Sequence, residues 1–413
     1  MRAYDCCRYS NFFDLYLLHT LFFGLVIGIC VAPPAWAVDA QKIQVHGFAS
    51  QAYTLTNKNN FFGESTGKGS LEATELGINT SWRALPEVQL SGQLLWRKAG
   101  NIGNEKIQLD YGFVDYRFFS NEQHHHGVRF GRIKNPLGLY NDTRDVAFIR
   151  PGVILPQSIY FERTRDLALS SDGGELYGEL RFSANTLGWE LMIAQPRTHD
   201  VDTEIALLGA DRLGNLQGDA SFIGRLIYDY YGGRVRLAIS SARLNLEYQP
   251  GSGDPSGSGA IRFTPVIFSG QFNSEKWTLT SEYARRHFLF GDNIIYVPLT
   301  LKKITGQSYY LQGSYRLTDK WGLMIRYDVA YQNIDDKTGG KLEAQTAGTL
   351  PGYSQFSKDW TIGARWQPSP AWMVRAEQHW INGTAWLPFQ DNPDRTKTYQ
   401  HWRLFTVLVS YRF

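Results

Sequence analysis

The sequence has only three cysteines, Cys6, Cys7 and Cys30, and none after residue 30. The rest of the chain therefore cannot form disulfides or thiolate metal sites. After Val38 the sequence also lacks any apolar run close to the roughly 18 residues that a membrane-spanning helix needs. These absences exclude a disulfide-stabilised secreted domain and a helical membrane protein.

Neither sign of charge dominates, because 42 Lys and Arg face 39 Asp and Glu, for a net charge of +3. We therefore expect no nucleic-acid partner. His124, His125 and His126 are adjacent but have no carboxylate or cysteine at ligand spacing, so we expect no metal and no cofactor. The chain also lacks a nucleophile elbow, and we predict no catalytic residues and no enzymatic activity.

Residues 1–37 are predicted to be an export signal peptide. An apolar run from Leu15 to Ala32 is followed by two prolines and by the small-x-small tripeptide at 35–37. Cleavage would then precede Val38. The alternative, a membrane-spanning anchor, is disfavoured because the run ends at the prolines and has no positively charged flank after it.

Aromatic residues and glycine are abundant, with 24 Phe, 23 Tyr, 12 Trp and 40 Gly spread through a polar chain. Apolar and polar side chains alternate in many segments, as in strands with one face on lipid and the other on water. One apolar face consists of Trp321, Leu323, Ile325, Tyr327, Val329 and Tyr331. The alternation predicts strands at about 43–55, 72–83, 88–98, 107–119, 127–134, 174–182, 188–194, 221–230, 235–248, 261–272, 277–288, 306–317, 321–331, 358–367, 372–380 and 399–413.

The connections between these segments are alternately long and short, which is typical of outer-membrane barrels with long extracellular loops and short periplasmic turns. Residues 38–413 are therefore predicted to be all-β, a transmembrane antiparallel β-barrel of about 16 strands. Its location would be the Gram-negative outer membrane, in contact with lipid and lipopolysaccharide. The last strand alternates from Phe405 to the terminal Phe413, which resembles the assembly signal of such proteins.

Together these features resemble the sixteen-stranded bacterial porins, whose third external loop folds into the barrel and narrows the pore. The longest predicted connection, 135–173, is the third external loop here. Residues 131–139 (GRIKNPLGL) and 161–163 (FER) are similar to a segment of the phosphate-selective porin O and P family. That family lines its pore with many lysines and arginines, whereas the predicted lumen here mixes arginines with carboxylates.

The resemblance implies a water-filled channel for small hydrophilic solutes or ions, in which pore width and rings of charge act as the filter. We expect the third loop to supply the charged constriction residues Asp142, Arg144, Asp145, Arg150, Glu162, Arg163, Arg165 and Asp166. We expect the facing lumen wall to present Arg129, Arg225, Glu282, Arg326, Arg375 and Glu377. These charges either create a transverse field across the pore or pair with one another and hold the loop against the wall.

The predicted polar faces hold more arginines than carboxylates, which favours a mild anion preference. The arginines are Arg83, Arg97, Arg129, Arg181, Arg225, Arg236, Arg262, Arg316, Arg326, Arg365 and Arg375. The resemblance also implies a homotrimer. Two alternatives stay open: an outer-membrane barrel enzyme, which would need a nucleophile or acid pair at the rim, and a structural barrel that does not conduct.

Overall fold

The structure is a computed structural model that describes residues 42–103, 105–198, 200–298 and 301–413. The predicted signal peptide, residues 1–37, lies outside the described residues. Residues Gln44–Phe413 form one compact unit. Within the described chain, no helix has the length and apolar character needed to cross a membrane.

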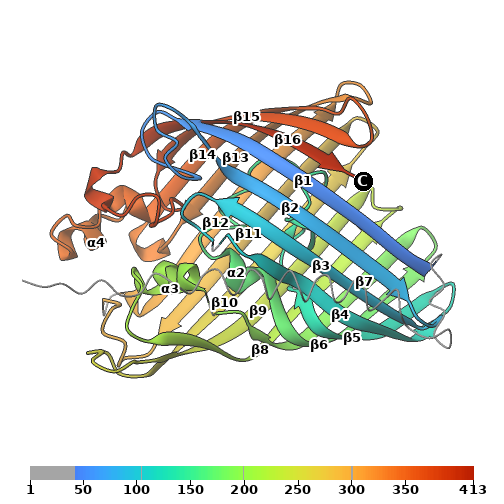
Figure 1. Cartoon of the computed structure of the whole chain (residues 1–413), viewed down its shortest axis with the longest axis horizontal. Helices are drawn as coiled ribbons and strands as arrows, with labels where there is room; N and C mark the ends of the chain where they lie inside the picture. The colour runs from blue at the N-terminus through green and yellow to red at the C-terminus, as the bar shows by residue number, and fades with distance from the viewer. Residues whose placement is uncertain (1–41, 104, 199, 299–300) are drawn as a thin grey trace, which may run out of the picture. The chain divides into compact units, whose positions relative to one another are not determined.

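Sixteen antiparallel strands of the described chain close into a barrel, in which each strand pairs with its neighbours in sequence and β1 pairs with β16 (Figure 1). The strands are β1 (Ile43–Thr56), β2 (Ser70–Arg83), β3 (Val88–Ala99), β4 (Ile107–Ser120), β5 (His124–Lys134), β6 (Ser170–Phe182), β7 (Asn185–Pro196), β8 (Asn215–Tyr230), β9 (Val235–Gln249), β10 (Gly259–Asn273), β11 (Trp277–Phe290), β12 (Lys303–Arg316), β13 (Trp321–Tyr331), β14 (Phe356–Trp366), β15 (Trp372–Gly383) and β16 (His401–Arg412). The predicted fold class is confirmed.

Connections that follow odd-numbered strands are long, and those that follow even-numbered strands are short, as at 84–87 and 274–276. In an antiparallel barrel this alternation gathers all short turns at one end. The long connections contain the helical elements η3 (Asn141–Thr143), α2 (Arg165–Leu169), α3 (Val201–Leu208), η5 (Ile334–Asp336), α4 (Gly340–Gln345), η6 (Gly352–Gln355) and η7 (Arg395–Lys397). In Figure 1, α3 and α4 lie at the end of the barrel with the long connections.

The outward faces of the strands expose large apolar side chains. Ile325 on β13 and Ile362 on β14 are about half exposed, at 51% and 50%. Aromatic pairs next to the short turns include Trp321 with Trp366, at a ring-centroid distance of 5.8 Å. Such an apolar band with aromatic residues at its border fits lipid contact and not a soluble surface.

The inside of the barrel is filled in part by two apolar clusters that join wall residues to the connection between β5 and β6. One cluster contains Leu137 and Leu167 of that connection, and the other contains Ile154 and Phe161. The clusters thus pack this segment against inward-facing side chains. The polar groups of the segment form their hydrogen bonds and ion pairs with side chains of the barrel wall.

Candidate functional site

The segment between β5 and β6 spans residues 135–169, because the predicted loop residues 170–173 belong to β6. Its charged, hydroxyl and backbone groups contact inward-facing side chains of β2, β8, β11, β13 and β15. A segment with partners on strands this far apart around the barrel crosses the interior. It therefore determines how much of the interior is open.

Glu282 of β11 is one anchor for this segment, and its side chain is fully buried. Its carboxylate accepts hydrogen bonds from the hydroxyls of Tyr160, at 2.7 Å, and Tyr310, at 2.8 Å. It also accepts one from the backbone amide of Leu139 at 3.0 Å. A buried carboxylate is tolerated when donors surround it in this way.

Gly138 fits closely beside this anchor. Its φ of +64° lies in the left-handed region, and a Cβ there would come within 2.4 Å of the Tyr160 hydroxyl. Its amide donates to Ser240 Oγ at 2.8 Å, and its carbonyl accepts from Arg225 Nη1 at 3.1 Å. Only glycine satisfies both the conformation and the close approach.

Arg225 of β8 joins the same end of the segment to the neighbouring wall. Its Nη2 lies 2.7 Å from Asp142 Oδ2, and its Nε lies 2.7 Å from Glu190 Oε2. The predicted wall residue Arg225 and the predicted loop residue Asp142 are therefore partners. Their charges, together with that of Glu190, partly cancel.

On β15, the predicted wall residues Arg375 and Glu377 bind the backbone of the segment. Arg375 Nη1 donates to the carbonyl of Ala147 at 2.8 Å. Glu377 Oε1 accepts from the amide of Val153 at 2.7 Å, and its Oε2 accepts from that of Ile154 at 3.2 Å. Arg375 thus binds a backbone carbonyl and Glu377 binds backbone amides. Together the two side chains fix the path of residues 147–154.

On β13, an arginine and a carboxylate, Arg326 and Asp328, likewise bind the backbone of the segment, at residues 154 and 158. Arg326 Nη1 donates to the carbonyl of Ile154 at 3.1 Å. Asp328 Oδ2 accepts from the amide of Ser158 at 3.2 Å. All of these wall groups are nearly inaccessible to solvent, so they act as supports for the segment.

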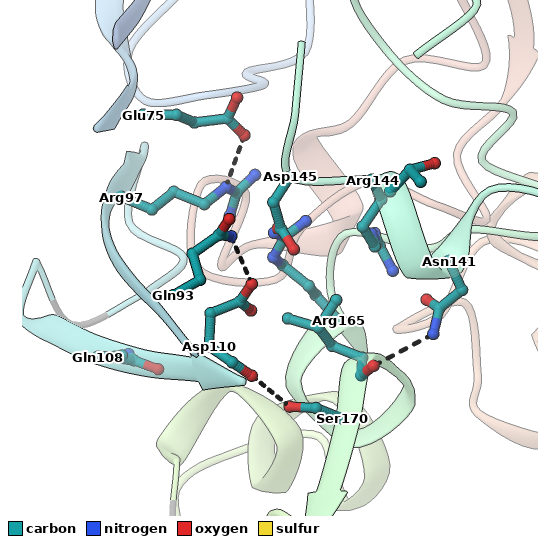
Figure 2. Close-up of polar contacts among 12 residues, drawn as sticks. Glu75, Gln93, Arg97, Gln108, Asp110, Asn141, Arg144, Asp145, Arg165 and Ser170 are labelled. Carbon is teal, nitrogen blue, oxygen red and sulfur yellow. Dashed lines mark hydrogen bonds and ion pairs between the residues drawn. The ribbon is translucent and has the colours of Figure 1, made fainter. Parts of the chain in front are cut away.

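An ion-pair cluster joins the segment to β2 and β3. Arg150 forms a bidentate pair with Glu75, at 2.6 and 3.2 Å. Arg97 lies 3.4 Å from Glu75 and 2.5 Å from Glu162, and Glu162 also pairs with Arg144 at 3.3 Å. Figure 2 shows Arg97 directed at Glu75 in this cluster. Bidentate arginine pairs of this kind have the most specific geometry among ion pairs.

Asp145 is the centre of a second cluster, next to the first in Figure 2. It pairs with Arg165 and with Lys134, and Lys134 also lies 2.6 Å from Asp110. Gln93 Nε2 donates to the other Asp110 oxygen at 2.7 Å. Thus two buried carboxylates face two cations, which compensates the charges inside the barrel.

Three predicted residues lie apart from these networks. Arg129 of β5 pairs with Asp115 at 3.2 Å and Glu175 at 2.8 Å, both on the wall and not on the segment. Among the described residues, neither Arg163 nor Asp166 has a carboxylate or cation at ion-pair distance. Burial lowers the pKa of Arg163 to about 10.

Three residues that surround the predicted site were expected neither in the constriction nor on the lumen wall: Lys134, Tyr160 and Arg286. Arg97 was expected on a polar face, and the structure pairs it with Glu75 and Glu162. Lys134 and Tyr160 gave no such signal in the sequence, because their contacts depend on the fold of the segment. One assignment was wrong: Arg262, placed on the lumen face, alternates with the inward Ile261 and Phe263 and points outward.

Cavities lie on both sides of the segment. One is lined by Tyr140 and Ile149 together with Ser274 and Lys276 of a short turn, so it faces the short-turn end. Another is lined by Ile159, Phe161 and Leu167 of the segment together with side chains from long connections. The segment therefore lies between a cavity toward each end. Among the described residues, no group of three His, Cys, Asp or Glu side chains could hold a metal ion.

No protein-family model matches this sequence, and no curated protein resembles it at the level of sequence. Several solved structures share its fold. The anion-selective porin from Comamonas acidovorans has a TM-score of 0.56 at 12% identity, over 90% of this chain and 99% of the porin. The outer membrane channel DcaP of Acinetobacter baumannii has a TM-score of 0.53 at 12% identity, over 90% and 97%. The trimer form of OmpT, an outer membrane protein of Vibrio cholerae, has a TM-score of 0.52 at 9% identity, over 90% and 99%. The fold is that of Gram-negative outer-membrane porins.

Proposed function

We propose that this chain forms a water-filled channel in the Gram-negative outer membrane, through which small hydrophilic solutes diffuse passively. One observation carries the proposal: residues 135–169 are bound to the inner wall on several sides and lie between two cavities. The apolar outer surface supports a membrane location. A segment fixed by buried hydrogen bonds gives a constriction of constant width, as size filtering requires.

We propose further that this constriction has a mild anion preference. Most of the predicted constriction charges are compensated by ion pairs, as Arg150 is by Glu75. Arg163 and Arg286 both line the cavity on the long-connection side, and neither has an ion-pair partner among the described residues. Uncompensated cations between low-dielectric walls raise the local concentration of anions.

Residues 131–139 are similar to a segment of the phosphate-selective porin family, but we do not propose selectivity for phosphate. Within this stretch, Lys134 is paired with Asp110 and Asp145. Arg132 pairs with Asp172 of β6 at 2.7 Å. Neither cation is free to bind a phosphate ion in the lumen, so we propose a general preference for anions.

Electrical recordings test the proposal against the two alternatives. Purified protein added to a planar lipid bilayer should produce stepwise, ohmic current increases in potassium chloride. A folded barrel that inserts without current would be a structural barrel. A barrel that does not conduct but hydrolyses a peptide or ester would be an enzyme. We propose that this chain is not an enzyme.

We also propose that the barrel assembles as a homotrimer in outer-membrane lipid. The support is the trimer form of the similar OmpT and the apolar outward faces that a neighbouring barrel could cover. Unheated samples on denaturing gels, and native mass measurement in detergent, should both give three times the monomer mass. A solely monomeric species in both measurements would contradict this.

A further inference from the structure

The cavity on the long-connection side of residues 135–169 has an apolar lining and a volume of about 180 Å³. The rings of Phe263, Phe288 and Phe290 line its barrel-wall side, with successive centroids 4.4 and 6.1 Å apart. The buried side chains of Leu167 and Val297 line its other side. Because an apolar cavity of about 150 Å³ accommodates benzene, this one has room for a single ring.

Within the described parts of the chain, the charged residues that line this cavity are arginines: Arg144, Arg163 and Arg286. Arg144 is compensated by Glu162 at 3.3 Å. Arg286 of β11 is only 6% exposed, and its Nη2 donates to the carbonyl of Tyr331 at 3.3 Å. Its Nε has no hydrogen-bond partner among the described residues.

Among the residues that the structure describes, no carboxylate forms an ion pair with Arg286. Asp328 Oδ2 accepts a hydrogen bond from the amide of Ser158. The guanidinium of Arg286 lies instead over the ring of Phe161, 4.4 Å from its centroid. Arg163 lies 5.7 Å from the same ring. A buried cation without a counter-charge is costly, so an anion at this place would stabilise the site.

A second cavity connects this site to the long connections. It shares Arg163 and Leu301 with the first cavity and extends to Phe389 and Arg395. Arg395 lies 3.8 Å from the centroid of Phe389, and Arg163 lies 5.6 Å from it. One carboxylate, Asp394, also lines this outer cavity, and it pairs with Lys397 at 3.0 Å. Positive charge and aromatic surface thus continue from the outer cavity to Arg286.

We propose that the inner cavity binds small organic anions in which one carboxylate is attached to an aromatic or short aliphatic body. The carboxylate pairs with Arg286 and Arg163, and the body packs against Phe263, Phe288 and Phe290. An inorganic anion would leave the apolar surface uncovered, and a neutral ring would leave the arginines uncompensated. This inference rests on the proposed channel function in one respect only, because the channel is the route by which the ligand reaches the cavity.

Isothermal titration of the detergent-folded protein with benzoate tests the proposal without conduction. Benzoate should bind saturably. Both acetate and benzyl alcohol should bind at least tenfold more weakly, because acetate lacks the aromatic ring and benzyl alcohol lacks the carboxylate. Equal binding of acetate would show a plain anion site, and equal binding of benzyl alcohol would show a plain apolar cavity. Either result, or the absence of benzoate binding to a folded barrel, overturns the proposal.

Substitution of the cations locates the site. Arg286→Gln and Arg163→Gln should each weaken benzoate binding about tenfold, as for loss of a charged hydrogen bond. Arg243→Gln is the matched control, because Arg243 is exposed on the outward face of β9. If the control weakens binding as much as the two variants, the cavity is not the site. If benzoate binds but bilayers show no current, the channel proposal fails and this one stands.

Discussion

The hydroxyl of Tyr160 donates a 2.7 Å hydrogen bond to Glu282 Oε2 and thereby joins the segment between β5 and β6 to the inner wall at β11. The same hydroxyl accepts hydrogen bonds from the amides of Leu139 and Tyr140, at 2.8 and 3.0 Å. A single oxygen therefore links both ends of the segment to one buried carboxylate. The path of the segment depends on this oxygen.

We expect Tyr160→Phe to destabilise the folded protein by about 2 kcal/mol, because it leaves buried polar groups without a partner. Urea unfolding in lipid vesicles, followed by tryptophan fluorescence, measures the free energy of unfolding. Tyr309→Phe is the control, since Tyr309 points outward and is 37% exposed. Equal stability of the two variants would show that the Tyr160 hydroxyl does not anchor the segment.

Ion selectivity should depend on Arg163 and Arg286, which line the cavity on the long-connection side and have no ion-pair partner within the described chain. The double change Arg163→Gln with Arg286→Gln should shift the reversal potential in a salt gradient toward cation preference. The shift should be larger in dilute salt, because salt screens the field. The matched control changes the outward-facing Arg243 and Arg403 to Gln. A pore that prefers cations before any substitution, or one that the double change leaves unaltered, would contradict the proposed anion preference.

Stability of the external helix α3 should depend on pH through Asp200, whose side chain accepts a hydrogen bond from the amide of Thr203. Burial, and then the charge of Asp166, raise the pKa of Asp200 from 3.8 to about 6. The folded loop thus binds this proton more tightly than an opened loop does. Its stability is therefore greatest below about pH 4 and falls as the pH rises to about 6.

Hydrogen exchange at the Thr203 amide, corrected for intrinsic rates, measures this effect. Protection should be greater at pH 5 than at pH 7. Asp200→Asn keeps an N-cap side chain and has no carboxyl to titrate, so its protection should not change over this range. Equal pH dependence in the variant would assign the effect to another group, such as Asp202.

Most of the barrel could be predicted from the sequence because side-chain alternation is a local property. The strand expected at 321–331 has these bounds in the structure, as β13. The strand expected at 221–230 begins earlier, at Asn215 in β8. There the outward Gln217 and Asp219 are polar and the inward Leu216 is apolar, so the alternation that marks a lipid-facing strand is reversed. The same reversal, with Arg262 outward beside the inward Ile261, explains why Arg262 was placed on the wrong face.

The candidate site was less predictable. The charged residues of the segment could be named from their number and position, but their partners could not. Residues 75 and 150 form an ion pair because a long connection folds back across the interior, and no local pattern encodes that path. Glu282 likewise accepts hydrogen bonds from two neighbouring strands, β10 and β12, and from the segment. Packing of the segment selects such contacts, so they require the structure.

The central claim is that residues 135–169 narrow a water-filled channel. Its most direct test is single-channel conductance after replacement of residues 140–168 by a short Gly-Ser linker. The barrel should still fold, because Glu282 and Glu377 would then be hydrated in a wider lumen and would not remain buried without partners. A matched control shortens the connection between β13 and β14 at residues 341–349, which should leave the conductance unchanged. We predict a larger conductance and a higher solute size limit for the first variant alone; a folded first variant with unchanged values of both would contradict the account.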